Sequence, residues 1–121
     1  MIIDPKEIGV PNINFSLYCK DDDCSEKYKL QRIERGFDDS ETWDLGTTFS
    51  KFMIPRLERY LEYSSKFIII EDDFMKDIND ILIALKLIIR EDSIQIFTKT
   101  EKLQVKIGLQ CLTDNFMNLW N

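Results

Sequence analysis

The side chains of this sequence that could do chemistry are mostly carboxylates, gathered in three clusters. Each cluster precedes or begins a predicted helix, where acids cap free N–H groups and favour the positive end of the helix dipole. None has the alternating ligands, central glycine and distal glutamate of a calcium loop. We therefore interpret them as capping and solvating groups, with partner binding as the functional alternative. The clusters are Asp21-Asp22-Asp23, Asp38-Asp39-Glu41-Asp44 and Glu71-Asp72-Asp73.

The chain contains no histidine, and this limits its chemistry severely. The absence removes the usual general base near neutral pH, the Ser-His-Asp and Cys-His arrangements, and the commonest transition-metal ligand. Cys19, Cys24 and Cys111 are too few for a structural zinc site without histidine, and we expect reduced thiols. Asp77 and Asp80 could belong to a carboxylate site, but an exposed helix face explains them better.

We therefore expect no enzymatic activity, no catalytic residue, no cofactor and no bound metal. A carboxylate-metal enzyme is a third and weaker hypothesis. The four glycines are scattered and form no phosphate-binding loop.

Charge is distributed unevenly along the chain, whose formal net charge is −6. Residues 1–45 hold 11 Asp/Glu against 6 Lys/Arg, whereas residues 46–121 hold 11 against 10. A negative balance argues against direct binding of nucleic acid, which requires Lys and Arg to displace counterions. The acidic first third can steer a protein partner with a basic surface, or it can simply keep a small protein in solution.

Length and composition indicate one globular domain. The chain has 121 residues and 44% hydrophobic content, enough for a core without metal or disulfides. No apolar run approaches a membrane span, and the first residues lack the features of a signal peptide, so we expect a cytoplasmic protein. We predict an all-α fold: a compact bundle of about four main helices, with residues 1–24 as an extended arm or loop and 25–121 as the helical core.

In the first half of the chain, capping residues and glycines predict where helices begin and end. Ser25 is the expected N-cap of a helix that ends at Gly36. Ser40 can cap a short helix over Glu41–Leu45, and Gly46 interrupts it. Thr47 or Thr48 then starts a longer helix. Before all of these, residues 13–19 alternate between apolar and polar, which fits either a short strand or a packed arm.

The longer helix carries an apolar stripe with helical spacing. Pro55 lies within it and should bend the helix, and Ser64-Ser65 should end it. Residues 66–70 form either a short strand or the apolar approach to the next helix. Asp72 or Asp73 caps that helix, of about 17 residues, with Lys76, Asp77, Asn79 and Asp80 facing water. The two apolar stripes are Phe49, Phe52, Met53, Leu57, Tyr60 and Leu61, then Phe74, Ile78, Ile81, Leu82, Leu85, Ile88 and Ile89.

A last helix should start at the capping box formed by Thr98 and Glu101. Gly108 within it would allow a neighbouring helix to approach closely. Its apolar stripe is expected to face the core, and we expect Phe37, Trp43 and Trp120 to pack inside as well. Tyr18, Tyr28 and Tyr63 are candidate interface anchors. The stripe is Leu103, Ile107, Cys111 or Leu112, Phe116, Leu119 and Trp120.

Two motifs carry a resemblance to a known family. The first runs from Gly36 to Leu45 as GFDDSETWDL, a glycine-aromatic pair, an acidic turn and then Thr-Trp and Leu. The second runs from Lys51 to Leu57 as KFMIPRL. Together they resemble a family of small bacteriophage and prophage proteins without an established activity. The match covers about a quarter of the chain, and Gly46 stands where family members often have aspartate.

The resemblance implies a phage origin and assigns no catalytic residue. We therefore expect a non-enzymatic interaction protein that binds, and inhibits, a host protein such as a nucleic-acid-handling defence effector, in the manner of anti-CRISPR proteins. The alternative is a structural or assembly protein that acts through homo-oligomerisation. The predicted partner-binding residues are Asp21, Asp22, Asp23, Asp38, Asp39, Glu41 and Asp44.

Overall fold

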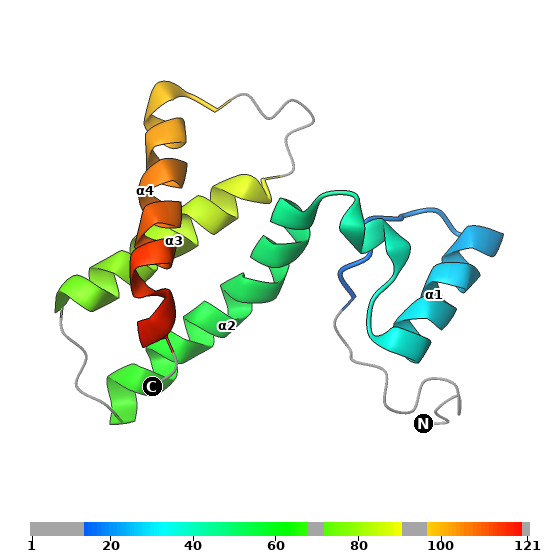
Figure 1. Cartoon of the computed structure of the whole chain (residues 1–121), viewed down its shortest axis with the longest axis horizontal. Helices are drawn as coiled ribbons and strands as arrows, with labels where there is room; N and C mark the ends of the chain where they lie inside the picture. The colour runs from blue at the N-terminus through cyan, green and yellow to red at the C-terminus, as the bar shows by residue number, and fades with distance from the viewer. Residues whose placement is uncertain (1–13, 68–71, 91–96, 120–121) are drawn as a thin grey trace. The chain divides into compact units, whose positions relative to one another are not determined.

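The structure, a computed structural model, describes residues 14–67, 72–90 and 97–119 (Figure 1). Within these ranges it contains helices and no strand, which confirms the all-α prediction. The chain divides into two compact units, one ending at Thr48 and the other starting at Phe49. This division groups the first helix with the residues of the predicted arm. A single domain over 1–121, with a helical core over 25–121, stays a prediction.

The first helix, α1, spans Asp23–Arg35 and is bounded by two local signals. Asp22 caps its start, so the predicted cap at Ser25 is wrong. Aspartate caps as well as serine does, and its charge also complements the helix dipole. Gly36 ends the helix as predicted: its φ is 88°, and its N–H donates to the carbonyl of Arg32 at 2.9 Å. Residues 14–22, before the helix, form neither helix nor strand.

A 3-10 helix, η2 (Asp39–Thr42), stands where the sequence predicts a short α-helix over Glu41–Leu45. Asp38 occupies the N-cap position that was predicted for Ser40. The N–H of Asp38 donates to the Glu41 carboxylate at 2.7 Å, as in a capping box. The hydroxyl of Ser40 is used by other contacts, described below.

The long helix α2 spans Leu45–Phe67 and begins earlier than predicted. Asp44 accepts a hydrogen bond from the Thr47 N–H at 3.1 Å, which is the contact of an N-cap. Gly46 lies in the first turn, where N–H groups have no intrahelical acceptor, so it does not interrupt the helix.

Farther along α2, the predicted break at Ser64-Ser65 is wrong because the helix continues to Phe67. Serine is a slightly weaker helix former than alanine, by tenths of a kcal/mol, too little to end an established helix. Pro55 lies inside the helix, and the bend expected there stays a prediction. Lys66 and Phe67 are helical; residues 68–70 of the expected strand or approach lie outside the described part.

The core of the second unit forms between α2 and α3 (Asp72–Ile88), which has the predicted length, although Asp72 and Asp73, the predicted caps, lie in its first turn. Apart from Ala84, the buried side chains of α3 fall on its predicted stripe, and Phe74 packs against Tyr60 of α2 in a T-shaped pair with ring centroids 6.5 Å apart. On α2 the stripe is buried only in part, since Phe49 and Phe52 are exposed. The core cluster consists of Ile54, Leu57, Ile78, Ile81, Leu82 and Leu85.

Helix α4 (Lys99–Asn115) starts at the predicted capping box of Thr98 and Glu101. Gly108 is buried against α3, which confirms the predicted close approach. A Cβ at Gly108 would lie 2.3 Å from the Cβ of Ala84 and 2.5 Å from the carbonyl oxygen of Asp80. The two helices therefore meet through their smallest side chains.

The predicted apolar stripe of α4 is largely on the wrong face. Leu103 and Ile107 are exposed, and so is Phe116, which lies in the 3-10 helix η3 (Phe116–Asn118) after α4. Cys111, Leu112 and Leu119 do pack against the core. The contact through Gly108 sets which face of α4 meets α3; Leu103 and Ile107 stay exposed, with Ile107 at the edge of the contact, near Ile83.

Trp120, expected in the core, lies outside the described residues, as do residue 13 of the alternating segment and Glu71 of the third acidic cluster. In the part of the chain that the structure describes, no helix has both the length and the apolar character needed to cross a bilayer.

We predict that Gly108→Ala destabilises the protein by about 1–3 kcal/mol, because the added methyl group overlaps Ala84 and the Asp80 carbonyl. This result opposes helix propensity, which favours alanine by about 1 kcal/mol. The measurement is urea unfolding followed by far-UV circular dichroism. Lys106→Ala, on the exposed face of α4, is the control and should change stability little. A Gly108→Ala variant as stable as the natural protein would contradict the close approach.

Candidate functional site

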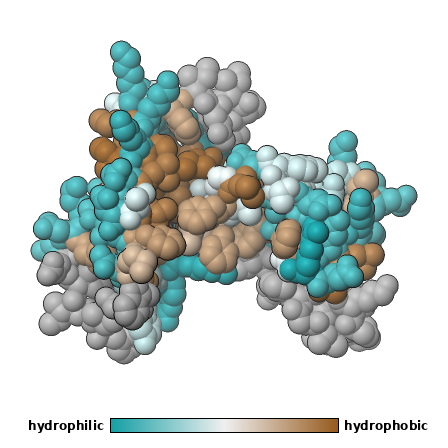
Figure 2. All heavy atoms as spheres, viewed as in Figure 1, coloured by the Kyte–Doolittle hydropathy of each residue, from teal (hydrophilic) through white to brown (hydrophobic). Residues whose placement is uncertain are grey.

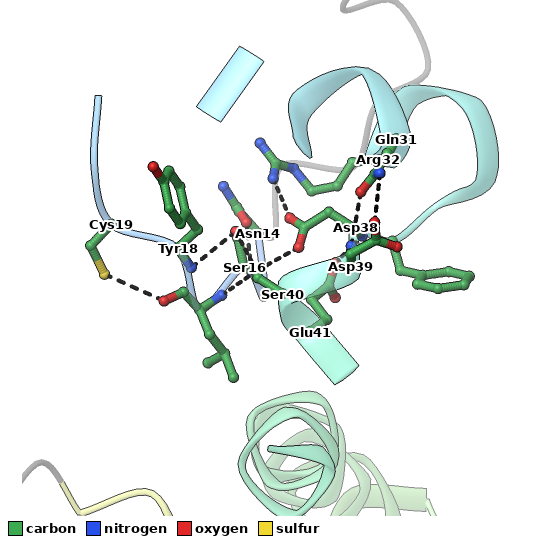
Figure 3. Close-up of polar contacts among 12 residues, drawn as sticks. Asn14, Ser16, Tyr18, Cys19, Gln31, Arg32, Asp38, Asp39, Ser40 and Glu41 are labelled. Atoms are coloured by element: carbon green, nitrogen blue, oxygen red, sulfur yellow. Dashed lines mark hydrogen bonds and ion pairs between the residues drawn. The ribbon is translucent and has the colours of Figure 1, made fainter. Parts of the chain in front are cut away.

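The acidic corner between α1 and η2 is built around Asp38 (Figure 3). Gly36 turns the chain back, so that Asp38 meets the last turn of α1. The Arg32 guanidinium donates to the Asp38 carboxylate at 2.5 Å, and the Asp38 side chain has no exposed surface. Burial raises the pKa of Asp38, but the hydrogen bonds from Ser40 and Arg32 and the charge of Arg32 outweigh it, so the pKa lies below its usual value.

Ser40 connects this corner to the chain segment before α1. Its hydroxyl donates to Asp38 at 2.5 Å and accepts from the N–H of Leu17 at 2.9 Å. The hydroxyl of Ser16 lies 2.9 Å from it. Because the single proton of Ser40 goes to Asp38, Ser16 must donate in this contact. The proton and both lone pairs of Ser40 are therefore used, in a position with no exposed surface.

Asp39 lies at the surface of the same corner and is also paired. Arg35 donates to its carboxylate at 2.5 Å, and the side-chain amide of Gln31 donates to it at 2.9 Å. The same amide accepts from the Asp39 N–H at 2.9 Å, which fixes the orientation of Gln31. The hydrogen bond from Arg35, followed by that from Gln31, lowers the pKa of Asp39.

The remaining predicted acids lie at helix starts. Asp22 accepts from the Tyr18 hydroxyl with both oxygens, at 2.8 and 2.7 Å, and this contact is the main cause of its lowered pKa. Hydrogen bonds from Thr47 lower the pKa of Asp44. The other two acids are exposed near the start of α1: Asp21 and Asp23.

The structure therefore brings Asp38, Asp39 and Glu41 together and separates them into two roles. Asp38 and Glu41 are buried and have almost no exposed surface with which to contact a partner. The prediction that these two residues belong to a contact face is therefore wrong. For the exposed acids, partner binding stays a prediction. These are Asp21, Asp22, Asp23, Asp39 and Asp44.

Three aromatic rings of the first unit form a cluster, which we call the ring cluster: Tyr18, Tyr28 and Trp43. The rings meet edge to face, with centroids 5.0 Å apart for the two tyrosines and 6.3 and 6.1 Å from Trp43 to Tyr18 and Tyr28. Trp43 is 59% exposed, and Phe37 is exposed as well, so the prediction that both are buried is wrong. An exposed tryptophan held by neighbouring rings is a typical anchor of a protein interface.

A second group of polar side chains lies where α3 meets α4. Asp77, Asp80 and Cys111 each offer one ligand atom, all within 4.8 Å of one another. Asp77 and Asp80 are half-buried rather than facing water as predicted. Asn115 donates to Asp77 at 3.1 Å, and Lys76 pairs with Asp80 at 3.3 Å.

To bind a divalent cation, this group would have to lose the proton of the Cys111 thiol and the ion pair between Lys76 and Asp80. Burial, followed by the charges of Asp77 and Asp80, raises the pKa of Cys111, so its thiol stays protonated near neutral pH. The ammonium group of Lys76 already compensates Asp80, and the hydrogen bond to Asp80 raises the pKa of Lys76. The charge of Lys76 thus compensates that of Asp80, and the Cys111 thiol is neutral. The expectation of no metal stays a prediction.

Hydrophobic residues also gather at the surface over α3 and α4 (Figure 2). Between the two helices lies a pocket of about 170 Å³, lined in part by Ile83 and Ile107. Ligand sites for cofactors or drug-sized molecules usually exceed about 300 Å³, so this hollow is too small for one. The exposed apolar side chains of the two helices and η3 are Ile83, Leu103, Ile107, Leu109, Phe116 and Met117.

Sequence reasoning missed the pairing of α1 with the acidic turn, although a signal was present. Arg32 and Arg35 precede Gly36, and Asp38 and Asp39 follow it. A left-handed glycine reverses the chain, so basic residues of the last helical turn meet acids just beyond it. The ring cluster had no such signal, because Tyr18 and Trp43 are far apart in sequence.

We predict that Arg32→Met destabilises the first unit by about 2–4 kcal/mol at pH 7, because it leaves the Asp38 charge buried without its ionic partner. The folded pKa of Asp38 is lowered, so the stability from its ionised form is present above the ordinary value of 3.8. That stability is lost as pH falls through the folded pKa. The cost of Arg32→Met should therefore shrink in acid.

Urea unfolding followed by Trp43 fluorescence, in a Trp120→Phe background, measures this stability at pH 7 and pH 3. The matched control is Arg35→Met, which removes the exposed pair with Asp39 and should cost much less. Equal losses for the two variants at pH 7 would show that burial of Asp38 does not govern the corner.

We predict that Asp77→Asn speeds alkylation of Cys111 by iodoacetamide at pH 8. Removing this carboxylate lowers the thiol pKa and raises the thiolate fraction, for a rate about three- to tenfold higher. Cys19→Ser and Cys24→Ser in the background leave one thiol to follow by mass spectrometry. Glu58→Gln, on the exposed face of α2, should leave the rate unchanged, and an unchanged rate in Asp77→Asn would refute the contact.

Comparison with known proteins adds no relative from which a function could be transferred. No protein-family model, no curated protein and no solved structure matches the chain. The resemblance of the segment from Gly36 to Leu57 to phage proteins stays a prediction, and the chemistry of the candidate site has to be argued from its own residues.

Proposed function

We propose that this chain is a non-enzymatic interaction protein that binds a protein partner with a basic surface. The observation that carries the proposal is the ring cluster, in which Trp43 is 59% exposed and held edge-on by two tyrosines. Large aromatic side chains of this kind contribute most of the energy of many protein interfaces. A tryptophan that is mostly exposed contributes little to a hydrophobic core, so its exposure favours a role in binding.

The charges around the ring cluster support a basic partner. Asp39 and Asp44 are exposed, on either side of Trp43 in the sequence, and hydrogen bonds hold both in place. The lowered pKa of each carboxyl group keeps it ionised well below neutral pH. Arg35 already pairs with Asp39, so the fixed negative charge left for a partner is that of Asp44, and such a charge speeds association with a partner of the opposite sign and selects it over others.

The resemblance to phage proteins extends this proposal to a class of partner. The partner is a host protein that handles nucleic acid, such as a CRISPR nuclease, and the acidic surface occupies its basic groove. Inhibition then follows from occupancy of that groove rather than from a chemical step. The resemblance supports this choice of partner, and the ring cluster supports the binding itself.

We predict that Trp43→Ala abolishes capture of the partner from a bacterial lysate by the immobilised protein. Loss of a central tryptophan typically weakens an interface by 2 kcal/mol or more, about thirtyfold in affinity. Proteins enriched by the natural chain and lost with Trp43→Ala are identified by mass spectrometry. Met117→Ala, which removes an exposed side chain of the second unit, is the matched control and should capture the same proteins.

Two outcomes would contradict the proposal. One is identical capture by the natural chain and by Trp43→Ala. The other is capture of nothing above background, combined with concentration-dependent dimers in light scattering, which would favour homo-oligomerisation through the exposed apolar residues of α3 and α4.

A further inference from the structure

Several exposed aromatic rings of this chain have an arginine over their faces. A guanidinium in this position is attracted by the negative face of the ring and shields it from water. The rings involved are 42–50% exposed, so they would otherwise contact solvent over much of their surface. The pairs, with distances from the guanidinium carbon to the ring centroid, are Arg35–Phe37 at 4.3 Å, Arg56–Phe52 at 3.7 Å and Arg59–Tyr63 at 5.8 Å.

Trp43 differs from these rings. It is more exposed than any of them, at 59%, yet among the described residues no arginine or lysine lies over it. Its ring contacts are with Tyr18 and Tyr28, whose planes lie at 76° and 85° to that of Trp43. In the described part of the chain, Phe49 and Phe116 are also exposed and have no such cation, but tryptophan attracts a cation more strongly than phenylalanine does.

Charge around Trp43 favours a cation from outside the chain. Residues 14–48 contain nine Asp/Glu and five Lys/Arg. Asp44, exposed and ionised, directly follows Trp43 in the sequence. The Tyr18 hydroxyl donates to both oxygens of Asp22, which brings a further carboxylate next to the ring cluster.

We propose that the ring cluster receives an arginine side chain of the partner protein, with its guanidinium stacked on Trp43. This inference rests on the proposed partner-binding function and names the group that is recognised. Arginine fits better than lysine because its planar guanidinium stacks on an aromatic face while its N–H groups, in the same plane, still reach carboxylates. Lysine is a compact, strongly hydrated charge and loses more on leaving water. The partner completes for Trp43 the contact that the chain itself makes for Phe37, Phe52 and Tyr63.

The experiment titrates the full chain, carrying Trp120→Phe, with the acetylated peptide amide Gly-Gly-Arg-Gly-Arg-Gly-Gly and follows Trp43 fluorescence. We expect saturable quenching with a dissociation constant in about the millimolar range, as befits a short peptide without the rest of an interface. The same peptide with lysine in place of arginine should bind at least about tenfold more weakly. Added salt should weaken binding, because exposed carboxylates contribute to it.

Two variants test whether the site is the one proposed, with binding followed by calorimetry. Trp43→Leu should abolish binding of the arginine peptide; the exposed position allows this change without loss of the fold, which circular dichroism checks. Phe116→Ala removes another exposed ring and should leave binding unchanged. Absence of saturable quenching up to about 10 mM peptide, or equal binding of the lysine peptide, overturns the inference.

Failure here and failure of the proposed function give different results. If lysate capture depends on Trp43 but the arginine peptide does not bind, the partner uses other chemistry at the ring cluster and only this inference fails. If capture does not depend on Trp43, the proposed function fails whatever the peptide does.

Discussion

The constraint on which the first unit depends is the charge of Asp38, which is ionised and has no exposed surface. A buried charge is tolerated only when ionic and hydrogen-bonding partners replace the water that it has lost. Here the partners come from three separate pieces of chain: Arg32 of α1, Ser40 of η2 and, through Ser40, the segment that contains Ser16. Meeting this one requirement therefore fixes the positions of all three pieces.

The placement of the candidate binding surface follows from that requirement. Tyr18 belongs to the segment held by Ser40, Tyr28 belongs to α1, and Trp43 follows directly after η2. Each ring is thus attached to one of the pieces that Asp38 holds together. A ring cluster positioned in this way loses little conformational freedom when a partner binds, which improves affinity without any added contact.

In the second unit, small residues rather than a buried charge determine how two of the helices pack. Gly108 and Ala84 let α3 and α4 approach closely, and this contact sets which side of α4 is buried. Leu103 and Ile107 remain at the surface as a result. Contiguous exposed apolar side chains on a small protein mark a surface that is commonly covered by another molecule.

Local signals in the sequence were sufficient for much of this fold. The glycine after α1, the capping box of α4 and the periodic stripe of α3 each act within a few residues, so Gly36, Thr98 and Ile78 could be placed correctly. Capping by one residue rather than another, as at Asp22 and Asp38, depends on small differences between competing polar groups.

The face of α4 and the surroundings of Trp43 could not be predicted, because both depend on contacts between segments that are distant in sequence. An apolar stripe indicates which residues prefer burial, but the close approach at Gly108 decides which of them achieve it. Trp43 was expected inside because tryptophan is usually well buried on average. Because Trp43 is exposed, the segment around it is a candidate binding surface as well as a connection between helices.

The saturated hydroxyl of Ser40 has an evolutionary consequence. Alanine at this position would leave the N–H of Leu17 and an oxygen of Asp38 without these partners. Threonine would keep the hydroxyl but add a methyl group at a fully buried position. Only another hydroxyl residue can make all three contacts, so a change of Ser40 to any other kind of residue has to be accompanied by changes at Ser16 and Asp38. Drift at the surface acids around it faces no such barrier, and the charge offered to a partner can diversify while the corner beneath it stays the same.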